Sequence, residues 1–204
     1  MERCCPRCDT PTADGICSHH PGAPVLICSR QADYDDFAAV VVAAAGLPLY
    51  LPWPLEPDVS LSGLGYAEDD RGRPVATVCT TTGPSALDGD IDLTVVTEEP
   101  LVGLGARIAG LAHADPGPTV GDGPAALHVR LDDHHVPLWP VPVEGDEVLQ
   151  AAAFVGEWEG RWLWVIAHPA TSILDWGGEI EIRDAAQFGP EALDLPFGGA
   201  TDRW

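Results

Sequence analysis

The sequence predicts an α+β fold, in which a mostly antiparallel β-sheet with one or two helices follows a small metal-binding segment. Three observations lead to this prediction: five of the six cysteines lie within the first 28 residues, most later stretches alternate apolar and polar residues, and one stretch has a helical pattern. Runs of strands with few helices favour an antiparallel sheet. We therefore expect a zinc-knuckle module at residues 1–30 and an α+β sheet domain at residues 31–204, with the module packed at the sheet edge.

The composition is that of a folded, acidic protein. The chain has 204 residues, of which 46% are hydrophobic, and a formal net charge of −22. No nucleic-acid partner is expected, because nucleic acid selects a basic surface. The uncharged residues 37–55 contain Gly46, Pro48, Pro52 and Pro54, so their helical part is too short to span a bilayer. No apolar run follows the first residues, and we expect a cytoplasmic protein without a membrane partner.

Residues 32–45 form the strongest helical pattern. Three aspartates precede apolar residues at helical spacing, and Gly46 with Pro48 ends the run. Alternate prolines then predict an extended, polyproline-like path for residues 47–54. We expect the Leu, Tyr and Trp side chains of that segment to lie on the surface or line a groove.

The rest of the chain predicts strands. Residues 60–67 and 74–81 flank the turn Asp69-Asp70-Arg71-Gly72, and residues 148–156 and 161–167 flank Glu157-Trp158-Glu159-Gly160. Alternation also predicts a half-buried strand around residues 91–95 and strands at 127–132 and 180–183. Residues 98–111 are ambiguous, because their apolar spacing suits a short helix that two glycines weaken.

The strongest chemical signal is the spacing Cys5-x2-Cys8-x8-Cys17-x2-His20, which we call the knuckle. Each short pair makes a turn that points two donors at one ion, and the loop brings the pairs together. Three thiolates and one imidazole complete a tetrahedral site, which predicts a structural zinc rather than a catalytic one. Three alternatives stay open: Cys4 for Cys5, His19 for His20, and Cys28 as a fourth thiolate. Cys79 is expected to be a small core residue.

Motifs along nearly the whole chain resemble those of one family. In order, they are Cys5-Pro6-Arg7-Cys8, Cys17-x-x-His20, Leu51-Pro52-Trp53-Pro54-Leu55, Gly63-x-Gly65-Tyr66-Ala67, Asp69-Asp70, Glu98-Glu99, Gly103-Leu104-Gly105-Ala106-Arg107, Asp115-Pro116-Gly117-Pro118, Pro137-Leu138-Trp139 and Gly160-Arg161-Trp162-Leu163-Trp164. On these motifs the chain resembles an uncharacterised actinobacterial family, the domain of unknown function 6758, with a zinc-ribbon-like knuckle. The resemblance implies no established activity, and no motif supports the name phosphotransacetylase that some relatives bear. It implies Gly after Cys8, where this chain has Asp9, which adopts a left-handed backbone less readily.

Two further clusters are candidate sites. Gly103, Gly105 and Arg107 suggest an anion-binding loop, although close backbone packing explains the glycines equally well. The cluster Asp132-Asp133-His134-His135 suggests a second metal, but a solvated hairpin turn is the favoured interpretation. His113, with Asp115, and His168 are candidate general bases without a nucleophile motif beside them.

The aromatic residues bear on function. Trp158, Trp162 and Trp164 have period-two spacing and are expected on one face, as core in preference to an exposed groove. We expect a noncatalytic interaction or regulatory protein, with a structural zinc and a protein or small-molecule partner. The alternative is an enzyme that acts on an anionic small molecule through Arg107 and His113. No catalytic residue is assigned.

Overall fold

The computed structural model describes residues 1–85, 89–118, 120–142, 150–176, 179–201 and 204. Its strands are β1 Glu2–Cys4, β2 Val25–Ser29, β3 Tyr50–Pro52, β4 Ser60–Glu68, β5 Pro74–Ser85, β6 Gly89–Glu98, β7 Leu127–Leu131, β8 His134–Val141, β9 Ala152–Trp158, β10 Arg161–His168 and β11 Glu179–Asp184. The α-helices are α1 Tyr34–Ala43 and α2 Leu104–Ile108, and short 3₁₀ helices cover Ala170–Trp176, Ala185–Gln187 and Pro190–Asp194. In the described residues, no helix is long and apolar enough to cross a membrane.

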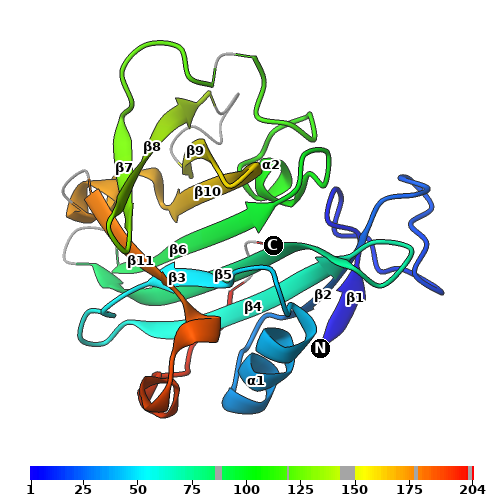
Figure 1. Ribbon diagram of the computed structural model, residues 1–204, viewed down its shortest axis with the longest axis horizontal. Helices are drawn as coiled ribbons and strands as arrows, with labels where there is room; N and C mark the ends of the chain where they lie inside the picture. Colours follow the sequence, from blue (N-terminus) through cyan, green and yellow to red (C-terminus); the bar gives the residue numbers. More distant parts are fainter. Residues whose placement is uncertain (86–88, 119, 143–149, 177–178, 202–203) are drawn as a thin grey trace.

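The strands form one continuous sheet in the order β1-β2-β4-β5-β6-β10-β9-β8-β7-β11-β3. Neighbours pair antiparallel except β7 and β11, which are parallel. The sheet curls on itself, so that its last strand β3 lies against β5 and β6 near the middle of the molecule (Figure 1). The predicted fold class, a mostly antiparallel sheet with two helices, is confirmed.

Helix α1 forms where the sequence predicts it, between Asp33 and Gly46. The Asp33 side chain caps the helix by accepting a hydrogen bond of 2.8 Å from the Asp36 amide. Phe37 and Val40 are buried against residues of β4 and the C-terminal 3₁₀ helices. The helix ends before Gly46, whose φ of 90° suits glycine.

The proline-rich segment after α1 differs from the prediction. Leu47, Leu49, Tyr50 and Leu51 are buried rather than on the surface, and β3 pairs with β11. The prolines fit because β3 is an edge strand, where a missing N–H breaks no second ladder. Their neighbours are therefore free to fill the core inside the curled sheet. A groove is nevertheless present, since Leu47 and Tyr50 line a cavity described below.

Strand β6 is also more buried than the sequence predicts. Alternation suggested a half-buried strand, but Thr94 is fully buried along with Leu93 and Val95. The cause is its central position between β5 and β10, with one hydrophobic cluster on each side of the sheet. Thr94 satisfies its hydroxyl with Thr80 on the next strand, at 2.8 Å.

The first thirty residues contribute two strands to this sheet. Strand β1 forms its edge, and β2 joins β4 along residues 25–29. The long loop between β1 and β2, which contains the knuckle, lies beside this edge (Figure 1). The boundary at residue 30 stays a prediction.

The hairpin of β9 and β10 corrects the expected tryptophan stripe. Trp162 and Trp164 pack with one core cluster, whereas Trp158 packs against the other. Trp158 pairs with Arg161 across the turn, and residues directly opposite each other share a face. Side chains alternate between the two faces within each strand, but this alternation does not continue through the turn at Glu159 and Gly160. Spacing alone therefore gives the wrong face for Trp158.

Candidate metal centre

The loop between β1 and β2 brings the four knuckle residues together. The ligand atoms of Cys5, Cys8, Cys17 and His20 all lie within 4.8 Å of one another. Cys5 Sγ and His20 Nδ1 are 3.6 Å apart, Cys8 Sγ and Cys17 Sγ 3.6 Å, and Cys17 Sγ and His20 Nδ1 4.0 Å. Ligands of a tetrahedral zinc lie roughly 3.5–3.8 Å apart, given its usual bond lengths. The four residues therefore fit one metal ion.

The first turn of the knuckle is held by its backbone. The Asp9 amide donates to the Cys5 carbonyl at 2.9 Å, and the Cys5 amide donates to the Thr10 carbonyl at 3.0 Å. Asp9 takes the left-handed conformation, with a φ of 59°, at the position where the family resemblance implies glycine. Its carboxylate offsets this strain by accepting a hydrogen bond from Arg30.

Burial disfavours the thiolate of one knuckle cysteine, Cys5. Cys5 and Cys17 are buried, while Cys8 and His20 are half-buried. Burial raises the pKa of Cys5 to about 12; the hydrogen bond from the Arg7 backbone opposes this rise, whereas those with Cys17 and Cys8 add to it. Burial also acts to raise the pKa of Cys8, but hydrogen bonds with Thr10 outweigh it and lower the pKa to about 5. A bound metal would compensate the charge of the Cys5 thiolate, which burial otherwise disfavours.

The alternative ligands lie elsewhere. Cys4 and Cys28 are buried in a hydrophobic cluster, and a hydrogen bond between them raises the pKa of Cys4 and lowers that of Cys28. The His19 ring lies against Thr10, with Nδ1 3.4 Å from its hydroxyl. In the part of the chain that the structure describes, only Cys5, Cys8, Cys17 and His20 form a potential metal-binding group. Cys79 is a buried core residue, as expected.

Two arginines attach the knuckle to α2 and the segment before it. Arg7 donates to the carbonyls of Leu101 and Val102, the latter at 3.1 Å. Arg107, on α2, donates through Nε to the Pro6 carbonyl at 2.7 Å. The segment before α2 and the first turn of the knuckle thus clasp each other, so Arg107 has a structural role that sequence reasoning missed.

The predicted anion loop is already occupied by a carboxyl group of the protein itself. The amides of Leu104 and Gly105 donate to the Glu98 carboxylate at 2.7 Å and 3.2 Å. Glu98 is fully buried, and burial raises its pKa to about 7 against the opposing effect of these hydrogen bonds. A Cβ on Gly105 would lie 2.4 Å from the Trp164 ring, so close packing explains this glycine. An external anion at Gly103 and Gly105 stays a prediction.

A cavity of about 190 Å³ adjoins the knuckle. It brings together Gly103, Arg107 and His113, but not Gly105, and its lining also includes Arg7 and His20. The buried Nη2 of Arg107 has no hydrogen-bond partner among the described residues. No carboxylate belongs to this lining, so the described walls are cationic.

The remaining candidate residues, 132–135 and His168, do not join the knuckle. Residues 132–135 are exposed at the turn between β7 and β8, as the favoured interpretation predicted. Asp132 and His134 line a second cavity, away from the knuckle. His168 is buried at the end of β10, before a cis peptide bond to Pro169.

Comparison with known proteins gives a family but no activity. No curated protein and no solved structure matches the chain significantly. A family model described as "Family of unknown function (DUF6758)" matches residues 1–204. This match agrees with the motifs from Cys5-Pro6-Arg7-Cys8 onward and covers the whole sequence. The chain therefore belongs to the family of unknown function DUF6758.

Proposed function

We propose that this is a noncatalytic interaction or regulatory protein of the cytoplasm, in which a structural zinc ion holds the knuckle. The observation that carries the proposal is the set of four donors, three sulfurs and one nitrogen, at tetrahedral spacing. Thiolate and imidazole donors suit zinc, and a site with four protein ligands leaves no position for a substrate. A reducing compartment keeps such thiolates available, which supports the cytoplasm.

The zinc would replace a core that the knuckle does not have. Ile16, an apolar residue of the loop, is exposed, and the described loop between β1 and β2 forms no strand or helix that buries it. A loop of this kind gains its stability from metal binding. Held in place, it presents Arg7 to the segment before α2 and completes the wall of the 190 Å³ cavity.

X-ray absorption at the zinc edge of the purified protein tests this proposal. We expect three sulfur ligands and one nitrogen ligand, with no change when a small external ligand such as cyanide is added. A Cys8→Ser variant is the matched comparison and should lose one sulfur or the metal itself. An oxygen ligand that exchanges with cyanide would indicate an open, catalytic site and would reject the proposal.

One observation supports the alternative, an enzyme that acts on an anionic small molecule. Arg107 and His113 both line the cavity beside the knuckle, and the buried Nη2 of Arg107 has no hydrogen-bond partner among the described residues. Such donors suit a phosphate or carboxylate. Calorimetry with acetyl phosphate tests it, since His113→Gln should abolish binding while His128→Gln, a substitution on the distant β7, should not. No binding to the wild-type protein would remove this alternative.

A further inference from the structure

We infer that the cavity between residues 44–50 and the turns after β7 and β9 binds a small organic cation that carries a guanidinium or primary ammonium group. This inference names the partner of the proposed noncatalytic protein, and to that extent it rests on the proposed function. It concerns a site remote from the knuckle, whose lining shares no residue with the cavity beside the metal.

The cavity is large enough for a small molecule. Its volume is about 410 Å³, and ligand pockets usually span about 300–1,000 Å³. Four chain segments that are distant in sequence enclose it: the approach to β3, the β7–β8 turn, the β9–β10 turn and the start of the 3₁₀ helix after β11. The curl of the sheet, which brings β3 and β11 beside β7, produces this enclosure.

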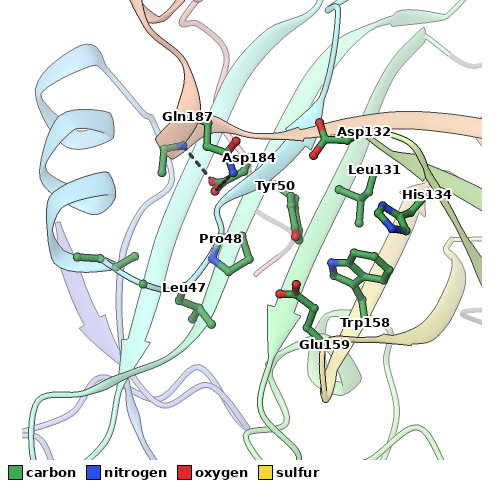
Figure 2. Close-up of a pocket in the computed structure, with 14 residues that line it drawn as sticks. Leu47, Pro48, Tyr50, Leu131, Asp132, His134, Trp158, Glu159, Asp184 and Gln187 are labelled. Atoms are coloured by element: carbon green, nitrogen blue, oxygen red, sulfur yellow. Dashed lines mark hydrogen bonds between the residues drawn. The ribbon is translucent and has the colours of Figure 1, made fainter.

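The charges around the cavity all have one sign. Carboxylates of Asp132, Glu159 and Asp184 line it, and no arginine does. Figure 2 shows these carboxylates on three sides of the opening, with Tyr50 between them. Because three negative charges surround one space, a cation gains from each of them when it enters.

Asp184 differs from the other two carboxylates because the protein fixes it. It accepts a hydrogen bond of 3.1 Å from the Leu49 amide. It also accepts hydrogen bonds from the Ala186 amide at 3.0 Å and from the Gln187 side chain at 3.2 Å (Figure 2). These donors are neutral, and none of the ion pairs recorded among the described residues includes Asp184. Asp132 and Glu159 take part in none of the ion pairs that the structure records among the described residues.

Two aromatic side chains, Tyr50 and Trp158, also line the cavity. The Trp158 indole packs against His134, with ring centroids 5.1 Å apart, and remains partly exposed. Tyr50 is 8% exposed, yet its hydroxyl points into the cavity, toward Trp158 and Glu159 (Figure 2). Tryptophan is the preferred aromatic partner of organic cations, and guanidinium groups stack on such rings while they bind carboxylates.

The same geometry argues against a metal ion as the occupant. Among the described residues, a potential metal-binding group with ligand atoms within 4.8 Å of one another occurs only at the knuckle. No three of the residues Asp132, His134, Glu159 and Asp184 therefore bring their ligand atoms close enough together to hold one ion. They surround a volume that a flat or elongated organic cation fills better.

Calorimetric titration of the zinc-loaded, full-length protein with agmatine tests the inference. Agmatine carries a guanidinium and an ammonium group, and hexane-1,6-diol serves as the neutral control. We expect saturable one-to-one binding of agmatine and none of the diol. Asp132→Asn with Glu159→Gln should weaken binding about tenfold or more, because both charges face the ligand.

A matched double variant separates the site from the general acidity of the protein. Asp133 and Glu157 are exposed neighbours of the two pocket residues and do not line the cavity. Asp133→Asn with Glu157→Gln removes the same two charges, and it should change the affinity by less than about twofold. Asparagine suits the left-handed backbone of Asp132, whose φ is 49°, so the pocket variant is expected to fold.

A comparison with a short arginine peptide shows which kind of cation the cavity binds. A blocked Gly-Arg-Gly peptide that binds more tightly than agmatine would identify the cation as an arginine side chain of a partner protein, and weaker binding would identify a small free amine. No saturable agmatine binding, or equal losses in the two double variants, would overturn the inference. Zinc content measured on the same samples keeps this failure distinct from a failure of the proposed structural zinc.

Discussion

Glu98 brings a carboxylate into the core where β6 ends, and the start of α2 is built around it. The amides of Leu104 and Gly105 both donate to it, so a carboxyl group of the protein occupies the start of the helix. The cost is desolvation, which raises the pKa of Glu98 to about 7. The sequence pattern pointed to Gly103, Gly105 and Arg107 but not to Glu98. A carboxyl group six residues before the amide that it binds, that of Leu104, belongs to no known motif.

The stability of the protein should depend on pH through Glu98. Its folded pKa of about 7 lies above the ordinary 4.5, so between these values the unfolded chain gives up the proton first. Stability therefore falls as pH rises through this window, by about 3 kcal/mol for a shift of this size. Urea titrations from pH 4.5 to 8 should show this fall in wild-type protein relative to Glu98→Gln.

The neighbouring Glu99 provides the control for that experiment. It pairs with Arg73 at the surface, with one contact of 3.0 Å, so Glu99→Gln should keep the wild-type pH dependence. Comparison between variants cancels the loss of metal at low pH, which affects all of them. A difference between wild type and Glu98→Gln that stays flat with pH would mean that Glu98 is not buried as a titrating acid.

Gly105 should tolerate no larger residue. An added Cβ would lie 2.4 Å from the Trp164 ring, and overpacking of this kind typically costs about 1–3 kcal/mol. We expect Gly105→Ala to lower the free energy of unfolding by that amount in denaturant titrations. Gly189→Ala is the control, because a Cβ there meets nothing within 4 Å; equal stability of the two variants would contradict the packing.

At the scale of elements, the knuckle and α2 hold each other through arginine. Arg107 donates to the Pro6 carbonyl, and its Nη1 lies 3.9 Å from the Asp9 carboxylate. Arg107→Met should therefore loosen the knuckle while the sheet stays intact. We expect faster zinc release to a chelator, measured with a colorimetric zinc dye, and faster protease cleavage within residues 5–24.

Arg3→Met is the matched variant for this clasp. Arg3 belongs to the same N-terminal segment but is exposed, with a 3.7 Å ion pair to Glu68; such surface pairs contribute about 1 kcal/mol or less. Its zinc release should equal that of the wild type. If both variants release zinc at the wild-type rate, the clasp does not stabilise the knuckle.

Local sequence patterns predicted the positions of helices and strands well, but predicted less well which side of the sheet a residue faces and how deeply it is buried. Helix α1 and the strands from β4 to β7 and β10 formed where capping residues and alternation placed them, because those signals act within a few residues. The face of Trp158 was wrong, since pairing across the turn rather than spacing decides it. The burial of β3 was missed because it depends on the distant β11.

At the scale of the whole molecule, only one site could be read from the sequence. The knuckle residues lie within sixteen positions, from Cys5 to His20. Because tetrahedral coordination requires pairs of ligands at short spacing, that spacing in the sequence predicts a metal site. The 410 Å³ cavity draws its lining from residues 44 to 187, and no local pattern records that Tyr50, Asp132 and Glu159 meet there. Such sites follow from sheet topology, which single-sequence patterns do not specify.

Loss of the metal should unfold one part of the protein and spare the rest. Cys17→Ser removes a buried ligand, so we expect loss of zinc and rapid amide exchange through residues 1–24. Amides of β5, β6 and β10, in the centre of the sheet, should remain protected in hydrogen-exchange mass spectrometry. Cys79→Ser, in the core away from the knuckle, should retain zinc; global exchange in Cys17→Ser would show that the sheet needs the metal to fold.

The most direct test of the central claim is the metal content of the purified protein, measured by elemental analysis after mild washing with a chelator. We predict one zinc per chain that resists washing in the wild type, because four protein ligands close the coordination shell. A protein without metal, or with metal that washing removes, would contradict the structural zinc. The cysteine cluster would then have to be explained as a group of reactive thiols.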